Sequence, residues 1–197
     1  MKLPSKTAPL VALKVIAGLA VALLLCLPAS AQSSANAPDS TKDPRRDPAN
    51  APGSAHGLVL QRNLSLPMAK TIAEAALAEC AAKGYHTAVA VVDRAGQIMV
   101  ILRDEQATAQ VAEMARRKAY TARMFRSTTL DFQKRTTPDA PNAAQRDVAD
   151  ILALGGGAPI LVGNEAVGGV GSAGSTQEQD DACAKAGVAK VADLLKP

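Results

Sequence analysis

A glycine-rich stretch constrains this chain more than any other. Residues 154–174, LGGGAPILVGNEAVGGVGSAG, hold eight of the fourteen glycines. Apolar runs at 159–162 and 166–170 flank the polar tripeptide GNE, which predicts two strands joined by a turn. Because glycine weakens a strand through its backbone entropy, so many glycines indicate positive φ angles or a close approach of the backbone to a ligand or another chain.

Part of this stretch matches a nucleotide-binding pattern. Residues 169–174, GVGSAG, fit G-x-G-x-x-G. A dinucleotide fold needs a further parallel strand after the helix that follows this pattern. The helix predicted here runs almost to Pro197, so no room for that strand is left. The sequence therefore disfavours nicotinamide or flavin binding of this kind.

The N-terminal 57 residues differ in composition from the rest. Lys2, Lys6 and Lys14 precede or enter an uncharged apolar run at 15–27, and Ala-Ser-Ala follows at 29–31. This pattern predicts an export signal over 1–31 and a periplasmic or secreted protein with no membrane span after cleavage. Residues 32–57 are rich in Pro, Ser and Ala, which is typical of a disordered linker.

Charge and aromatic content exclude one class of partner. The chain carries 22 basic and 18 acidic residues, and removal of the three signal lysines leaves a net charge of +1. With two Phe, two Tyr and no Trp, the chain also lacks an aromatic platform for stacking bases. We therefore expect no nucleic-acid partner.

Residues 58–197 have the size of one α+β domain. Strands are expected at 58–62, 87–92, 97–102, 159–162 and 166–170. A helix capped by Ser65 should end at Gly84, a second should lie within 104–126, and a third should follow a capping box at 175–178 and reach 195. A turn or two of helix is expected within the irregular segment 130–149.

Two cysteines fall inside this domain, Cys80 and Cys183. Each lies in a predicted helix among alanines. A disulfide is possible in an oxidising compartment, but two small buried thiols are the interpretation that the sequence favours.

The helix within 104–126 carries two different faces. Ala112, Ala115, Ala119 and Ala122 form a smooth face on which another element, including another chain, can approach closely. Basic residues lie on other faces. They form either a solvated surface or a binding site for carboxylates, since Arg and Lys recognise such groups well.

Five motifs resemble those of the GlcG/HbpS family, in the same order. They are AVAVVD-x-x-G, RRKAYTA-x-x-F, LGGGAPI, VGGVG and QDDACAKAG, and the resemblance covers about residues 64–196. The family includes haem-binding extracellular proteins and the C-terminal domain of PduO-type adenosyltransferases. The resemblance implies a profilin-like fold, a five-stranded antiparallel sheet with helices on both faces in α/β/α layers, and assembly into a homo-oligomer.

The same resemblance implies a haem site. The ligand-binding candidates are grouped on the RRKAYTA helix and in the triple-glycine turn: Arg116, Arg117, Lys118, Thr121, Gly155, Gly156 and Gly157. Haem needs an apolar slot, cations for its propionates and usually an axial donor. The His-Thr pair that exported family members often carry before this helix is replaced by Gln110 and Val111 here. The candidate axial ligands are therefore His86 and Met114.

Three classes of function remain open from the sequence. One is an exported binder of haem or another tetrapyrrole, acting in haem sequestration or sensing. The second is an oligomeric binder or an enzyme that acts on a small carboxylated metabolite, and the third is a purely structural oligomer. With two histidines and no Ser-His-Asp set or metal-ligand spacing, the sequence predicts no catalytic residues and disfavours the enzyme.

Overall fold

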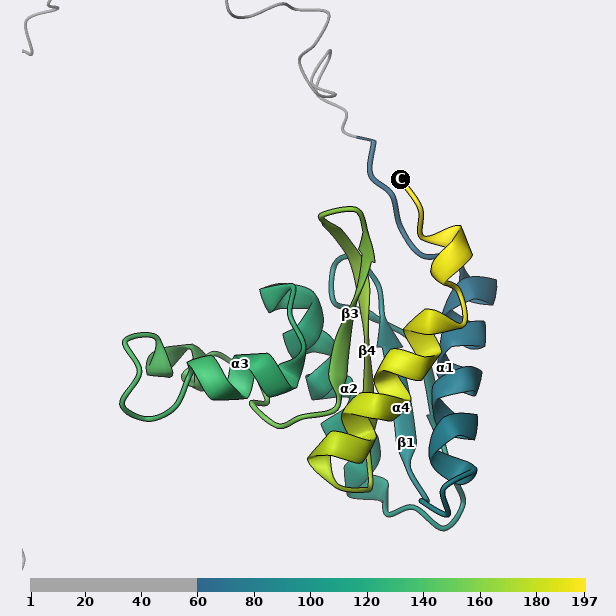
Figure 1. The fold of residues 1–197 in the computed structure, drawn as a ribbon, viewed down its shortest axis with the longest axis horizontal. Coiled ribbons are helices and arrows are strands. Elements are labelled where there is room, and N and C mark those ends of the chain that lie inside the picture. The colour runs from purple at the N-terminus through teal and green to yellow at the C-terminus, as the bar shows by residue number, and fades with distance from the viewer. Residues whose placement is uncertain (1–59) are drawn as a thin grey trace, which may run out of the picture. The chain divides into compact units, whose positions relative to one another are not determined.

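Four strands form one antiparallel sheet in the part of the chain that the computed structural model describes, residues 60–197. They are β1 (Ala88–Val92), β2 (Ile98–Arg103), β3 (Gly157–Val162) and β4 (Glu165–Ala173). Their spatial order is β2-β1-β4-β3, so the β1–β2 and β3–β4 hairpins are joined through the pairing of β1 with β4 (Figure 1). β4 runs three residues beyond the predicted end at 170.

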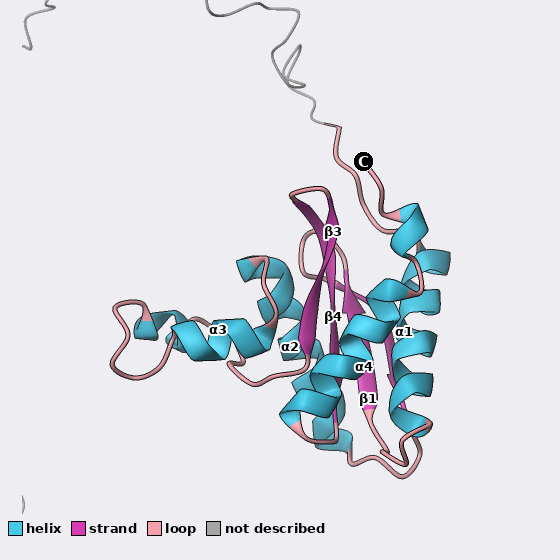
Figure 2. Cartoon of the chain, in the orientation of Figure 1, coloured by secondary structure: helices cyan, strands magenta, loops and turns pink. Residues whose placement is uncertain are grey.

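Helices cover both faces of this sheet. They are α1 (Leu66–Ala81), α2 (Ala109–Phe125), α3 (Thr129–Arg135) and α4 (Gln177–Ala189), with short 3₁₀ turns η3 (Ala143–Asp147) and η4 (Ala192–Leu194). α1 and α4 pack side by side on one face, and α2 packs on the other (Figures 1 and 2). The α+β class and the α/β/α layering therefore agree with the prediction.

Local sequence explains where the helices begin. The Ser65 side chain accepts a hydrogen bond from the Met68 amide at 3.3 Å, as predicted for α1. α4 is capped one residue later than predicted, by Thr176, whose side chain accepts from the Gln179 amide. α4 also ends at Ala189, before the predicted residue 195, and the chain continues into η4.

The central strand β1 separates two cores. Val89 and Val91 belong to the large core under α1 and α4. Ala88 and Ala90 alternate with them and pack beneath α2 with Ala115 and other small residues. Because both faces of β1 are covered, its sequence is an unbroken apolar run.

Glycine brings α2 unusually close to β4. A β-carbon added at Gly171 would collide with the carbonyl oxygen of Ala115, and one at Gly169 with that of Ala119. The close approach predicted from these glycines therefore occurs within the chain, between strand and helix. Ala115, Ala119 and Ala122, predicted as a face for assembly, are fully buried in the same contact.

The predicted first strand at 58–62 is not formed in its described part. Leu60, Gln61 and Arg62 lie in exposed irregular backbone, and Leu60 is 97% exposed. The apolar residue that enters the core here is Leu64, just before α1. The described sheet thus has four strands instead of five. The predicted signal and linker, 1–57, lie outside the described residues.

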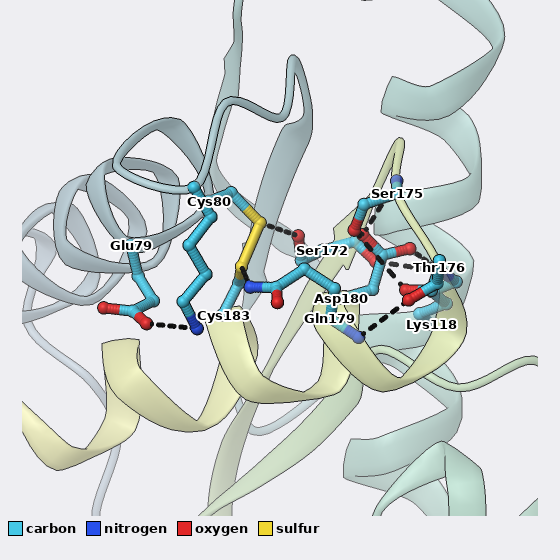
Figure 3. Close-up of a disulfide and its surroundings, with 10 residues drawn as sticks. Glu79, Cys80, Lys118, Ser172, Ser175, Thr176, Gln179, Asp180 and Cys183 are labelled. Carbon is cyan, nitrogen blue, oxygen red and sulfur yellow. Dashed lines mark hydrogen bonds and ion pairs between the residues drawn. A yellow bond between two sulfur atoms is a disulfide. The ribbon is translucent and has the colours of Figure 1, made fainter.

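Cys80 of α1 and Cys183 of α4 form a disulfide. Their Cα atoms are 5.6 Å apart, and both residues are fully buried (Figure 3). The favoured interpretation of two free thiols is therefore wrong. Helical spacing placed each cysteine on a buried face, but only the packing of α1 against α4 brings those faces together.

Candidate functional site

Lys118 forms the best-defined polar contact of the predicted site. Its side chain is buried, and Nζ donates hydrogen bonds to the Ser172 carbonyl oxygen at 2.9 Å and to Asp180 Oδ2 at 2.8 Å (Figure 3). The other carboxylate oxygen of Asp180 accepts from the amide and hydroxyl of Ser175. Burial lowers the pKa of Lys118, and the Asp180 carboxylate opposes that shift. Lys118 thus uses its hydrogen bonds within the fold, where it joins α2 to β4 and α4.

The triple-glycine turn lies directly beside this ion pair. A β-carbon at Gly156, where φ is +122°, would be 2.6 Å from the Asp180 β-carbon and 2.8 Å from Lys118 Nζ. One at Gly155 would be 2.5 Å from a methyl carbon of Leu130. Protein side chains already occupy the space next to these glycines. Their small size serves the packing of the turn in this chain, where the sequence suggested room for a flat ring.

Gly157 and Thr121 have equally local roles. The Gly157 amide donates to the Thr129 hydroxyl at 2.8 Å, which fixes the start of β3 against α3. The Thr121 hydroxyl donates to the Arg117 carbonyl and accepts from the Leu152 amide at 2.9 Å. The Thr121 side chain thus holds the segment that leads into β3 onto α2, and the Thr129 side chain holds the start of β3 onto α3.

The two arginines before Lys118 hold the same segment. Arg116 donates to Glu113 and Asp150, and these carboxylates raise its pKa. Arg117 donates from Nη2 to the Ile151 carbonyl oxygen at 2.6 Å, while its Nε is buried and has no hydrogen-bond partner in the described part of the chain. Arg117 therefore retains an unused donor.

His86 and Met114 lie at the end of the sheet where β1 begins. His86 Nδ1 is 3.1 Å from Asp104 Oδ1, and its side chain is 46% exposed. Two contacts lower the pKa of Asp104: first the hydrogen bond from the Gln106 amide and then the one with His86. Met114 is partly buried against the alanine cluster that includes Ala88. The sequence analysis missed Asp104, which orients the histidine from 18 positions away.

The structure also forms a cleft that the sequence analysis did not single out. Arg94, Arg123 and Arg126 line it at the opposite end of α2. The spacing of Arg123 and Arg126 along the helix is visible in the sequence, but the hairpin turn that carries Arg94 approaches them only in the fold.

Residues 60–197 contain neither a cluster of metal-ligating side chains nor a membrane-spanning helix. No group of three or more His, Cys, Asp or Glu side chains there could hold a metal ion. No helix in the same residues is long and apolar enough to cross a membrane.

The comparison with known families decides the relationship. The family described as "Haem degrading protein HbpS-like" matches residues 64–189. This chain belongs to the HbpS-like family. The match includes α1 to α4 and the whole sheet, so it spans every element that builds the candidate site.

Solved structures agree with this assignment. HbpS from Streptomyces reticuli, determined as a double mutant with aspartate in place of two glutamates, is 36% identical, with a TM-score of 0.65. The match covers 71% of this chain and 95% of that one. The crystal structure of a PduOC–haem complex is 25% identical, with a TM-score of 0.60, and covers 64% of this chain and 94% of that one.

A relative known from its sequence adds no activity. It is an uncharacterized 15.0 kDa protein of Citrobacter freundii from the dhaT–dhaS intergenic region, 29% identical over 119 residues. The match covers 59% of this chain and 84% of the relative.

Proposed function

We propose that this protein binds haem, with His86 as an axial ligand of the iron. The observation that carries the proposal is the pairing of His86 with Asp104. A carboxylate at Nδ1 fixes the tautomer and orientation of an imidazole, which is the usual arrangement around a metal-binding histidine. It leaves Nε2, the second ring nitrogen, without a hydrogen-bond partner among residues 60–197.

The surroundings of His86 fit a haem group chemically. The residues that follow it, Thr87 and Ala88, lead into the small apolar cluster under α2, against which Met114 packs. An apolar surface, an exposed imidazole and a thioether are the groups that haem sites use. Arg117 lies three residues beyond Met114 on α2, and its positive charge would attract a propionate. Bound haem would supply redox chemistry and ligand exchange at its iron.

Family evidence supports the same ligand. The matched family is described as haem-degrading, and the PduOC structure was determined with haem. Sequestration or sensing of haem outside the cytoplasm is the role that we infer from this ligand together with export. The predicted contributions of Arg116, Thr121 and the triple-glycine turn are then indirect, because these residues position α2 and the start of β3.

A haemin titration tests the proposal. The purified protein should give a saturable Soret change with micromolar haemin, and His86→Ala should shift the band and weaken binding. Asp104→Asn should weaken binding less, because the imidazole remains but loses its orienting carboxylate. Lys134→Gln, on exposed α3 surface, is the control. An unmutated protein without a saturable Soret change would refute haem binding, and an unchanged band in His86→Ala would refute the axial role.

We further propose that the protein is exported. The support is the charged start, the short apolar run and the Ala-Ser-Ala site of residues 1–31. The Cys80–Cys183 disulfide gives independent support, because such bonds persist in oxidising compartments. Mass spectrometry of the secreted or periplasmic protein should find a chain beginning at Gln32. A chain that retains Met1 would argue against cleavage.

Assembly into a homo-oligomer also remains a proposal. The predicted alanine face is buried within the chain, so another surface must serve. The edge strand β2 exposes Ile98 (51%) and Ile101 (40%), and an edge strand with exposed apolar residues favours pairing with another chain. Light scattering at micromolar concentration should report more than one chain per particle, and a monomer mass would count against this proposal.

A further inference from the structure

A cleft of about 540 Å³ lies at the C-terminal end of α2. Its arginines come from separate parts of the chain. Arg94 lies in the β1–β2 turn, Arg123 in the last turn of α2, and Arg126 at the C-cap, where φ is +51°. The β3–β4 turn, with Asn164 and Glu165, forms the opposite wall. A smaller cleft of about 350 Å³ shares Arg94 and Arg123, so these two side chains face open space on two sides.

Positive charge in this cleft is not balanced by the described residues. Arg94 pairs with Glu165, and Arg62 lies 3.9 Å from the other oxygen of the same carboxylate. Arg123 and Arg126 have no carboxylate partner among residues 60–197. Among the lining residues, the Glu165 side chain is already engaged by two arginines, and Pro197, the last residue of the chain, adds a carboxylate that is not within ion-pair distance of Arg123 or Arg126.

Arg123 is the clearest example of an arginine that lacks a partner in this cleft. Its Nε is buried and has no hydrogen-bond acceptor among residues 60–197. Burial lowers the pKa of Arg123, the nearby charges of Arg94 and Arg126 lower it further, and the more weakly acting Asp93 carboxylate opposes them. Such a donor is unfavourable unless an acceptor from outside the chain satisfies it.

A purely structural account covers only part of this arrangement. The carbonyl end of a helix attracts cations, which explains why Arg123 and Arg126 stand in the last turn of α2 and at its cap. It does not explain a third arginine brought against them from a different hairpin. Nor does it explain a buried guanidinium nitrogen without an acceptor beside an open cleft.

We propose that this cleft binds a compact anion with at least two negative charges, carried by phosphate or carboxylate groups, through Arg123 and Arg126. The planar guanidinium fork matches both kinds of group, and two forks from one helix end can bind two oxygens of one ligand. Arg94, held in place by its ion pair with Glu165, forms part of the cleft wall and contributes to its positive electrostatic potential. This site is separate from the haem site, because His86 and Arg94 lie at opposite ends of β1.

Isothermal titration calorimetry of the purified protein at low ionic strength tests the proposal, with inorganic pyrophosphate and succinate as separate probes. We expect saturable binding of one or both, and the comparison identifies the preferred acidic group. The variant Arg123→Gln/Arg126→Gln should bind at least tenfold more weakly. The matched control Lys83→Gln/Lys134→Gln removes the same charge from exposed positions on other elements and should change affinity by less than twofold.

A second measurement separates ligand binding from folding. Without anion, the double Gln variant should unfold within a few degrees of the unmutated protein, because the loss of two cations from the carbonyl end of α2 is offset by the removal of like charges. With pyrophosphate, the unmutated protein should gain thermal stability and the variant should not. Binding of neither probe, or equal binding to the variant, would overturn the proposal. Haemin titration of the same variant reports on the proposed haem site independently.

Discussion

The disulfide between Cys80 and Cys183 should be a large part of this domain's stability. It closes a loop across a sequence separation of 103 residues. In the chain-entropy treatment, a cross-link of that span restricts the unfolded chain by about 4.7 kcal/mol at 25 °C. Since small domains have net stabilities of roughly 5–15 kcal/mol, loss of the bond should bring the domain close to the limit of folding.

Urea unfolding with and without reductant measures this contribution. With a typical denaturant slope of about 2 kcal/mol per molar, the midpoint should fall by roughly 2 M when dithiothreitol is present. The variant Cys80→Ala/Cys183→Ala should unfold near the reduced midpoint and should not respond to dithiothreitol. That variant controls for effects of the reductant on anything other than this bond.

Two results would contradict the reasoning. If reduction by dithiothreitol lowered the urea midpoint by less than about a quarter of the expected shift, the cross-link would not restrict the unfolded chain as its loop length requires. If intact-mass analysis found both thiol hydrogens present in the native secreted protein, the bond itself would be absent.

Three further predictions concern single contacts. Lys118→Met should lower the free energy of unfolding by about 3–5 kcal/mol, because Asp180 is left buried without its cation, and adding Asp180→Leu should restore most of that loss. If urea unfolding instead showed that the effects of the two substitutions add, the two side chains would not be coupled. Gly171→Val should destabilise by at least about 1–3 kcal/mol because its β-carbon meets the backbone of α2, and a near-zero change in thermal unfolding would refute this. The pKa of Asp104 is lowered in the folded state, chiefly by the hydrogen bond from the Gln106 amide, so its carboxylate stabilises the fold at pH values above the ordinary carboxyl pKa and stops doing so as the pH falls. The Asp104→Asn variant should therefore lose less stability than the unmutated protein between about pH 5 and pH 2, as measured by urea unfolding.

Periodic patterns in the sequence predicted most of the fold. The helix capped by Ser65 could be predicted because apolar residues recur at helical spacing, and in the structure Ala69, Ile72, Ala73, Ala76 and Cys80 form its buried face. The paired strands were correct because short apolar runs flank turn residues such as those at 93–96 and 163–165. The predicted strand at 58–62 was wrong in its described part, because a short apolar run forms a strand only where a neighbouring strand pairs with it, and the sequence does not show whether such a neighbour exists. The profilin-like relationship stays a prediction.

Contacts between distant segments were beyond the sequence. Lys118 stands on a mixed helical stripe, and nothing local indicates that Asp180, 62 positions later, accepts its charge. The disulfide depends in the same way on how α1 meets α4. The glycines at 169 and 171 were correctly interpreted as points of close approach, but the element that approaches is α2 of the same chain.

The contact between α2 and β4 also limits where ligands can bind. At Gly171 and Gly169 the helix backbone lies so near the strand that even a β-carbon does not fit. A ligand that contacts both α2 and β4 must therefore bind at an end of the helix, because the middle of this contact has no room. The two ends differ in chemistry: an imidazole lies beside an alanine cluster at one, and at the other lie guanidinium groups without a carboxylate partner in the described part of the chain.

Between these ends Lys118 ties the middle of α2 to both β4 and α4. A movement of the helix that carried a signal from one end to the other would have to break this buried ion pair. We therefore expect the proposed haem and anion sites to bind independently. Haemin affinity measured in the Soret band should change by less than about twofold when pyrophosphate is present at saturation, which corresponds to a coupling free energy below about 0.4 kcal/mol. A tenfold change in either direction would show that α2 shifts as a unit and that the contact at Lys118 does not hold it in place.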